Sequence, residues 1–148
     1  MKKILMTVLF GVIAGFAFTQ ANHHPPKAVS ESFQKEYPRS SPSNWTHSTS
    51  GWSVEFEDRD FDNGEVTAHF DTRGRHMDTQ IPYDDGDVPA TVKDNLRNRY
   101  PGSDNYEYTR IERAGNQPLY KARFKHNKRY KTQYLDQQGE HHDYHQKY

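Results

Sequence analysis

Histidines are frequent in this chain and gather near its two ends. The sequence holds nine histidines in 148 residues, with Asn22-His23-His24 near the start and a run at 141–145 near the end. If the chain is cut after Ala21, the new amino group and a histidine at position three can hold Cu(II) or Ni(II) in a square plane of nitrogen ligands. The sequence therefore predicts a copper or nickel site at Asn22, His23 and His24. The alternative for both ends is a polar terminus without a ligand.

Charge is divided unevenly along the chain, although the net charge is zero. Residues 22–87 carry 6 Lys/Arg against 13 Asp/Glu, a charge of −7, and residues 88–148 carry 12 against 7, a charge of +5. These charges form either a solvated surface or a docking surface for a charged protein or peptide. The predicted docking residues are Glu55, Glu57, Lys121, Arg123, Lys125, Lys128, Arg129 and Lys131.

No motif in the sequence points to a reaction. The chain has no cysteine, no nucleophile elbow, no phosphate-binding loop and no zinc-protease motif. The stretch 58–65 has the acidic spacing of a calcium loop, but its glycine falls one place late and a histidine stands where the loop needs glutamate. A hairpin turn is the better interpretation of that stretch. We therefore expect no enzyme activity, and no cofactor apart from the copper or nickel ion considered above.

The first 21 residues have the features of a secretory signal peptide. Lys2 and Lys3 precede an apolar run at 4–18, and Thr19 and Ala21 are the small residues expected before a cleavage site. This run is short for a membrane span of about 20 residues, so an uncleaved anchor is the weaker alternative. We expect a periplasmic or secreted protein without a membrane span after cleavage. Its partner should be a protein or peptide of the cell envelope and not a nucleic acid.

A pattern of apolar residues recurs at an offset of 63 positions. The matching pairs are Val29 and Val92, Phe33 and Leu96, Tyr37 and Tyr100, Pro38 and Pro101, and Trp45 and Tyr108. The spacing of four predicts a short helix in each copy. Each helix should end at its tyrosine, because a following proline disfavours helical backbone in the residue before it. Stretches that alternate apolar and polar residues follow each helix, such as 52–57 and 120–125, and they predict strands.

These elements predict an α+β protein built from two tandem helix-plus-antiparallel-sheet repeats that share a sheet or core. The links between the strands are too short for the crossovers that parallel strands need. The predicted division is a signal peptide at 1–21, an acidic repeat at 22–87 and a basic repeat at 88–148. Aromatic residues make up 14% of the chain. They can supply a core that the aliphatic residues alone would leave thin, because each large ring can bury about 150–250 Å².

This arrangement resembles the PepSY-like family of beta-lactamase-inhibitor-like proteins. The resemblance is carried by the paired positions above, by the strand motifs Val54-Glu55-Phe56 and Ala122-Arg123-Phe124, and by the turns that run from Phe70-Asp71 to Gly74 and from Leu135-Asp136 to Gly139. It implies an exported binding or inhibitor-like module with two helix-plus-sheet units and no enzyme activity. The second copy departs from the family's apolar strand pattern by its many basic residues, so the halves are expected to differ in what they bind. The alternative function is a periplasmic metal-binding protein that uses its histidine-rich ends.

Overall fold

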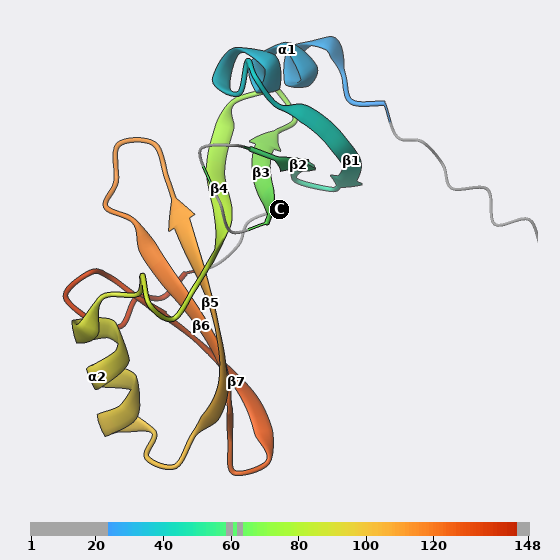
Figure 1. Ribbon diagram of the computed structural model, residues 1–148. Helices are drawn as coiled ribbons and strands as arrows, with labels where there is room; N and C mark the ends of the chain where they lie inside the picture. The colour runs from blue at the N-terminus through green and yellow to red at the C-terminus, as the bar shows by residue number, and fades with distance from the viewer. Residues whose placement is uncertain (1–23, 59–60, 62–63, 145–148) are drawn as a thin grey trace, which may run out of the picture.

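The computed structural model describes residues 24–58, 61 and 64–144 of the chain. Its elements are α1 Lys27–Glu36, β1 Ser41–Ser48, β2 Gly51–Glu57, β3 Glu65–Asp71, β4 His76–Tyr83, α2 Ala90–Arg99, β5 Asp104–Glu112, β6 Leu119–His126 and β7 Arg129–Leu135. The seven strands form one antiparallel sheet in which each strand pairs with the next along the chain, as Figure 1 shows. One helix precedes the sheet, and the other connects β4 to β5.

Both helices pack on the same side of the sheet. Directly paired residues of neighbouring antiparallel strands have their side chains on the same side. The pairs Val54↔Ala68, Ala68↔Thr79 and Thr79↔Glu112 therefore extend one side from β2 to β5. The α1 helix contributes to a core cluster on this side with β2, β3 and β4, and α2 contributes to a second cluster with β5, β6 and β7. Neither α1 nor α2 lies over the opposite side of the sheet.

The two helices end where the sequence predicts. The Tyr37 N–H donates to the Phe33 carbonyl at 2.8 Å, and the Tyr100 N–H donates to the Leu96 carbonyl at 2.8 Å, so the tyrosine before each proline closes its helix. Phe33 also anchors α1 on the sheet, with its ring centroid 5.1 Å from that of Phe56. No helix in the described part of the chain is long and apolar enough to cross a membrane.

Two tight turns press against the first turns of the helices. Gly74 lies between β3 and β4 with φ +84°, and Gly139 lies after β7 with φ +83°. A Cβ atom on Gly74 would be 2.5 Å from the carbonyl oxygen of Ala28 in α1, and one on Gly139 would be 2.6 Å from that of Thr91 in α2. Glycine is required at both positions because it has no side chain to clash and it adopts positive φ without strain.

The predicted fold class, α+β with two tandem helix-plus-antiparallel-sheet repeats, is wrong. The protein is mostly β, since two helices of ten residues each accompany one continuous seven-stranded antiparallel sheet. The decisive pairing is β4 with β5, from Thr79↔Glu112 to Tyr83↔Tyr108. This pairing joins residues on either side of α2, and no local pattern in the sequence reveals such a contact. The division of the chain at residue 87 stays a prediction.

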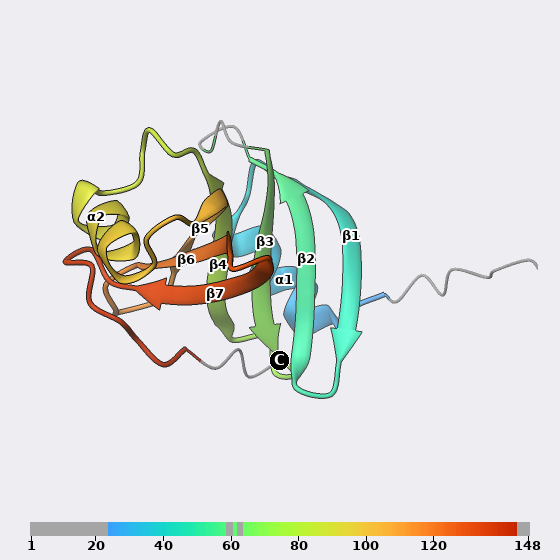
Figure 2. The same ribbon diagram turned by 90° about the horizontal axis from the view of Figure 1, so that it is seen from below.

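The chain beyond β7 turns back and crosses the side of the sheet that the helices leave open. Figure 2 shows this segment returning beneath β7. The His142 N–H donates to the Tyr134 carbonyl at 2.8 Å, and Leu135 and His141 form an antiparallel bridge. The Tyr144 hydroxyl then donates to the Asp78 carboxylate of β4 at 2.7 Å. The C-terminal segment, residues 136–144, thus connects β7 with the centre of the sheet.

Candidate functional site

The side of the sheet opposite the helices is the first candidate site, and we call it the uncovered face. Its side chains alternate along the strands with those of the two core clusters. Its residues are Ser53, Glu55 and Glu57 of β2, Glu65, Thr67 and His69 of β3, Asp78 and Gln80 of β4, Glu107, Thr109 and Ile111 of β5, Leu119, Lys121, Arg123 and Lys125 of β6, and Tyr130, Thr132 and Tyr134 of β7. Most of these side chains are polar, as expected for a sheet side that meets water or a partner.

The structure separates the predicted docking residues into two groups. Glu55 and Glu57 lie at one end of the uncovered face, and Lys121, Arg123 and Lys125 lie toward the other, with β3, β4 and β5 between them. The remaining three do not share this face. Lys128 lies in the turn between β6 and β7 with φ +63°. Arg129 and Lys131 point to the helix side, where the Lys131 ammonium lies 5.5 Å from the Tyr100 ring centroid.

Three basic side chains lie at the basic end of the uncovered face. Arg123 is ion-paired, whereas Lys121 and Lys125 are not paired within the described residues. Arg123 donates to both carboxylate oxygens of Glu107, at 3.1 and 2.8 Å, and its guanidinium lies 3.9 Å from the Tyr130 ring centroid. The hydrogen bond to Glu107 raises the pKa of Arg123 further above its ordinary value. Lys121 and Lys125 make no ion pair with any residue that the structure describes. These two ammonium groups can therefore meet an acidic partner.

A buried polar pair lies at the centre of the uncovered face. His69 Nδ1 and Asp78 Oδ1 are 2.9 Å apart, and the residues are only 6% and 1% exposed. The second Asp78 oxygen accepts the Tyr144 hydroxyl. This cluster was not predicted from the sequence. Asp78 could have been noticed, because the alternation along β4 places its side chain on the other side of the sheet from Thr79 and Ile81. Tyr144 lies in a polar tail that carries no such pattern.

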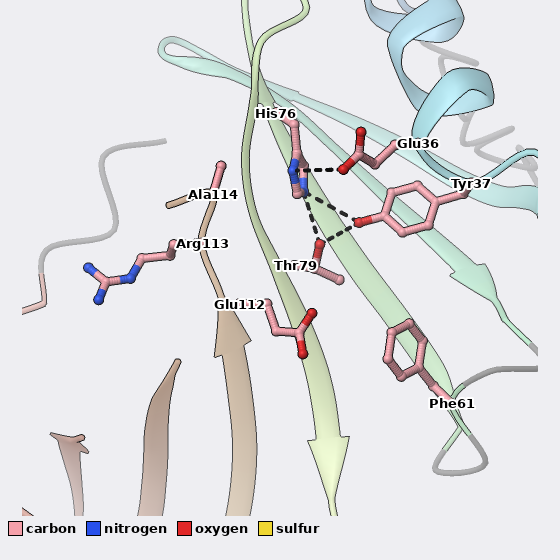
Figure 3. Close-up of a pocket in the computed structure, with 8 residues that line it drawn as sticks. All are labelled: Glu36, Tyr37, Phe61, His76, Thr79, Glu112, Arg113 and Ala114. Carbon is pink, nitrogen blue, oxygen red and sulfur yellow. Dashed lines mark hydrogen bonds and ion pairs between the residues drawn. The ribbon is translucent and has the colours of Figure 1, made fainter. Parts of the chain in front are cut away.

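A polar pocket of about 260 Å³ is the second candidate site, and it lies on the helix side between the end of α1, β4 and the end of β5. Figure 3 shows the side chains of Glu36, Tyr37, His76 and Thr79 pointing toward one another in it. The Tyr37 hydroxyl and His76 Nε2 both contact the Thr79 hydroxyl, the latter at 2.9 Å. His76 Nδ1 lies 3.9 Å from the Glu36 carboxylate. Burial, with added repulsion from the Glu36 and Glu112 carboxylates, raises the pKa of Tyr37 to about 12.

The pocket holds its polar groups in a structural arrangement and not in one suited to nucleophilic catalysis. The Glu36 carboxylate, the His76 ring and the Thr79 hydroxyl lie next to one another in the order of a catalytic triad. However, Thr79 is only 3% exposed, and its hydroxyl is already shared by Tyr37 and His76. The Glu36 to His76 distance is also too long for the hydrogen bond that orients a catalytic histidine. These contacts join the end of α1 to β4.

Alkaline pH should loosen this junction. Tyr37 loses its proton with a pKa near 10 in the unfolded chain and about 12 in the folded protein. The unfolded chain therefore releases the proton first, and the free energy of unfolding should fall as pH rises from about 10 to about 12. Denaturant titrations between about pH 9 and about pH 12 measure this fall. It should be smaller in Tyr37→Phe and unchanged in Tyr130→Phe, which alters a tyrosine that is 53% exposed. An undiminished fall in Tyr37→Phe would contradict the assignment.

The predicted copper or nickel site lies mostly outside the described residues. Asn22 and His23 are not described, and His24 is exposed at the start of the described chain. At the other end, His142 is 2.8 Å from Asp136. The described residues contain no group of three or more histidine or acidic side chains that could hold a metal ion. The site stays a prediction, which a Cu(II) titration of the mature protein tests: affinity should fall in His24→Ala and not in His142→Ala.

Known proteins resemble this chain in structure more than in sequence. No family model and no curated protein matches it. A DUF2874 family protein from Bacteroides uniformis has a TM-score of 0.71 and 18% identity, covering 80% of this chain and 86% of its own. An inferred periplasmic protein from Bacteroides eggerthii has a TM-score of 0.70 and 15% identity, covering 80% of this chain and 86% of its own. A BLIP-like protein from Bacteroides fragilis has a TM-score of 0.69 and 13% identity, covering 83% of this chain and 86% of its own. The chain therefore shares the fold of these BLIP-like and DUF2874 proteins.

Proposed function

We propose that this chain is an exported, non-enzymatic binding module of the PepSY-like, inhibitor-like type, which docks a protein or peptide of the cell envelope on its uncovered face. The observation that carries the proposal is the placement of both helices on one side of a continuous sheet, which leaves a broad polar side open. The likeness to a BLIP-like protein supports an inhibitor-like role. A periplasmic or secreted location is supported by the signal peptide predicted at 1–21, which lies outside the described residues, and by the likeness to the inferred periplasmic protein.

The partner should present acidic groups to β6 and basic or neutral groups to β2. Lys121 and Lys125 are half-buried. A charge–charge interaction is stronger at such a partly desolvated surface than in water. Glu55 and Glu57, at the other end, give the face an opposite charge. Such an arrangement orients a partner and accelerates its capture, and it makes binding sensitive to salt. A uniformly acidic or uniformly basic partner would be repelled at one end.

Reversing the charges of β6 should weaken capture of the partner by about tenfold or more. The mature protein carrying Lys121→Glu and Lys125→Glu is immobilised and compared with the wild type for proteins retained from an envelope extract. The matched control carries Arg129→Glu and Lys131→Glu, which changes the net charge equally on the neighbouring strand but on the helix side. A partner that docks on the uncovered face is lost by the first variant and kept by the control. Equal retention by both variants would place the interaction elsewhere.

A further inference from the structure

The C-terminal segment reaches the centre of the uncovered face, where Tyr144 contacts Asp78. Ile111 and Leu119 are directly paired on this face, and neither belongs to a helix-side core cluster. They are nevertheless only 0% and 2% exposed. The Tyr144 side chain contacts Asp78 of β4, Arg113 just after β5, and Tyr134 of β7. The C-terminal segment therefore lies on the same side of the sheet as this buried apolar pair, which belongs to neither helix-side core cluster.

Contacts with Asp78, Tyr134 and Arg113 help to hold Tyr144. Its hydroxyl donates to Asp78 Oδ2 at 2.7 Å, and the other oxygen of that carboxylate is fixed by His69. Its ring centroid lies 5.0 Å from that of Tyr134, at an interplanar angle of 49°. The Arg113 guanidinium lies 5.9 Å from the same centroid, within the range of a cation–π contact. Burial, together with the hydrogen bond to Asp78, raises the pKa of Tyr144 and keeps the hydroxyl a donor.

These contacts are selective for an unmodified tyrosine. Phenylalanine would fill the same space, but it would leave the buried Asp78 oxygen without its donor, which is costly in a site built for a hydrogen bond. Phosphotyrosine would bring its negative charge against the Asp78 carboxylate. A flanking cation and a second ring favour any aromatic side chain, so the hydroxyl alone distinguishes tyrosine from phenylalanine.

We propose that the centre of the uncovered face is a binding site for a tyrosine-bearing segment of the partner, and that the chain's own Tyr144 occupies this site in the free protein. The inference rests on the proposed function, because it takes the uncovered face as the docking surface. The hydrogen bond to Asp78 and the ring contact with Tyr134 indicate what the site recognises. A partner must displace the C-terminal segment, which competes at the high effective concentration of a tethered ligand.

The test uses the full chain with Tyr144→Ala and, as probe, the labelled synthetic peptide GEHHDYHQK, which corresponds to residues 139–147. Fluorescence anisotropy should show that this peptide binds Tyr144→Ala about tenfold or more tightly than it binds the wild type, because the competing side chain is gone. Peptides with phenylalanine or phosphotyrosine in place of the tyrosine should bind Tyr144→Ala about tenfold or more weakly. If Tyr144→Ala fails to fold, Tyr144→Phe, which removes only the hydroxyl, replaces it with the same expected order of affinities.

Equal affinity of the peptide for the wild type and the variant would overturn the inference, as would equal affinity of the three peptides or no binding at all. These outcomes are separate from those of the proposed function. Loss of capture on reversal of Lys121 and Lys125, combined with no peptide binding, keeps the docking face and removes the tyrosine site. Peptide binding with unchanged capture by the reversed variant keeps the tyrosine site and removes the predicted role of the basic strand.

Discussion

Gly74→Ala is expected to lower the free energy of unfolding by about 2–5 kcal/mol. A non-glycine residue in left-handed backbone costs about 1–2 kcal/mol, and overpacking adds about 1–3 kcal/mol. Both costs apply here, because Gly74 has φ +84° and its new Cβ would lie 2.5 Å from the Ala28 carbonyl oxygen and 3.2 Å from the Ser32 hydroxyl. The turn would have to move away from α1, and this movement would weaken the packing of the helix on β3 and β4. Urea denaturation followed by circular dichroism measures the change.

Gly102→Ala is the matched control for this prediction. Gly102 also has positive φ, at +75°, but nothing lies within 4 Å of its Cβ position. Its replacement should therefore cost only the backbone term of about 1–2 kcal/mol. Gly139→Ala should behave like Gly74→Ala, because its Cβ would lie 2.6 Å from the Thr91 carbonyl oxygen. A cost at Gly74 no larger than at Gly102 would show that the turn can move freely away from α1.

Local features of the fold could be predicted from the sequence, and the long-range arrangement could not. Each helix ends at its tyrosine because the next proline restricts that tyrosine's backbone, which is a purely local effect. Strand alternation at 52–57 and 120–125 is equally local, and both stretches lie in strands. The pairing of β4 with β5 depends instead on how α2 is accommodated between them. That pairing makes one sheet, where the sequence left open whether the two units share a sheet or only a core. The predicted fold class failed because only two short helices accompany the seven strands.

The candidate site shows the same division between local and long-range information. Alternation places Lys121, Arg123 and Lys125 together on one side of β6, as expected from a period of two. The same rule separates Arg129 and Lys131 from them, because cross-strand pairing with β6 sets those two on the helix side. The contact between Asp78 and Tyr144 spans 66 positions. Nothing in the composition of the tail distinguishes a tyrosine that folds back from one that does not.

Asp78→Leu and His69→Leu should each lower the free energy of unfolding by about 2–5 kcal/mol, whereas the double variant should cost much less than their sum. Removing one member of a buried pair leaves the other with an uncompensated polar group, and replacing both with apolar residues of similar size is often nearly neutral. The pair qualifies because His69 and Asp78 are 6% and 1% exposed and 2.9 Å apart. Denaturant titration of the four proteins gives the coupling energy directly.

The exposed ion pair of Lys27 and Glu31 supplies the control, since their 3.5 Å contact is largely in water and Glu31→Ala should change stability by about 0.5 kcal/mol or less. Simple addition of the two single costs would contradict the coupling between His69 and Asp78.

A double variant as stable as the wild type would bear on the role of the His69–Asp78 pair. Leucine at both positions would then serve the fold equally well, while Tyr144 would have lost its acceptor. Stability alone would not require the polar pair, and its remaining role would be to hold a tyrosine on the uncovered face.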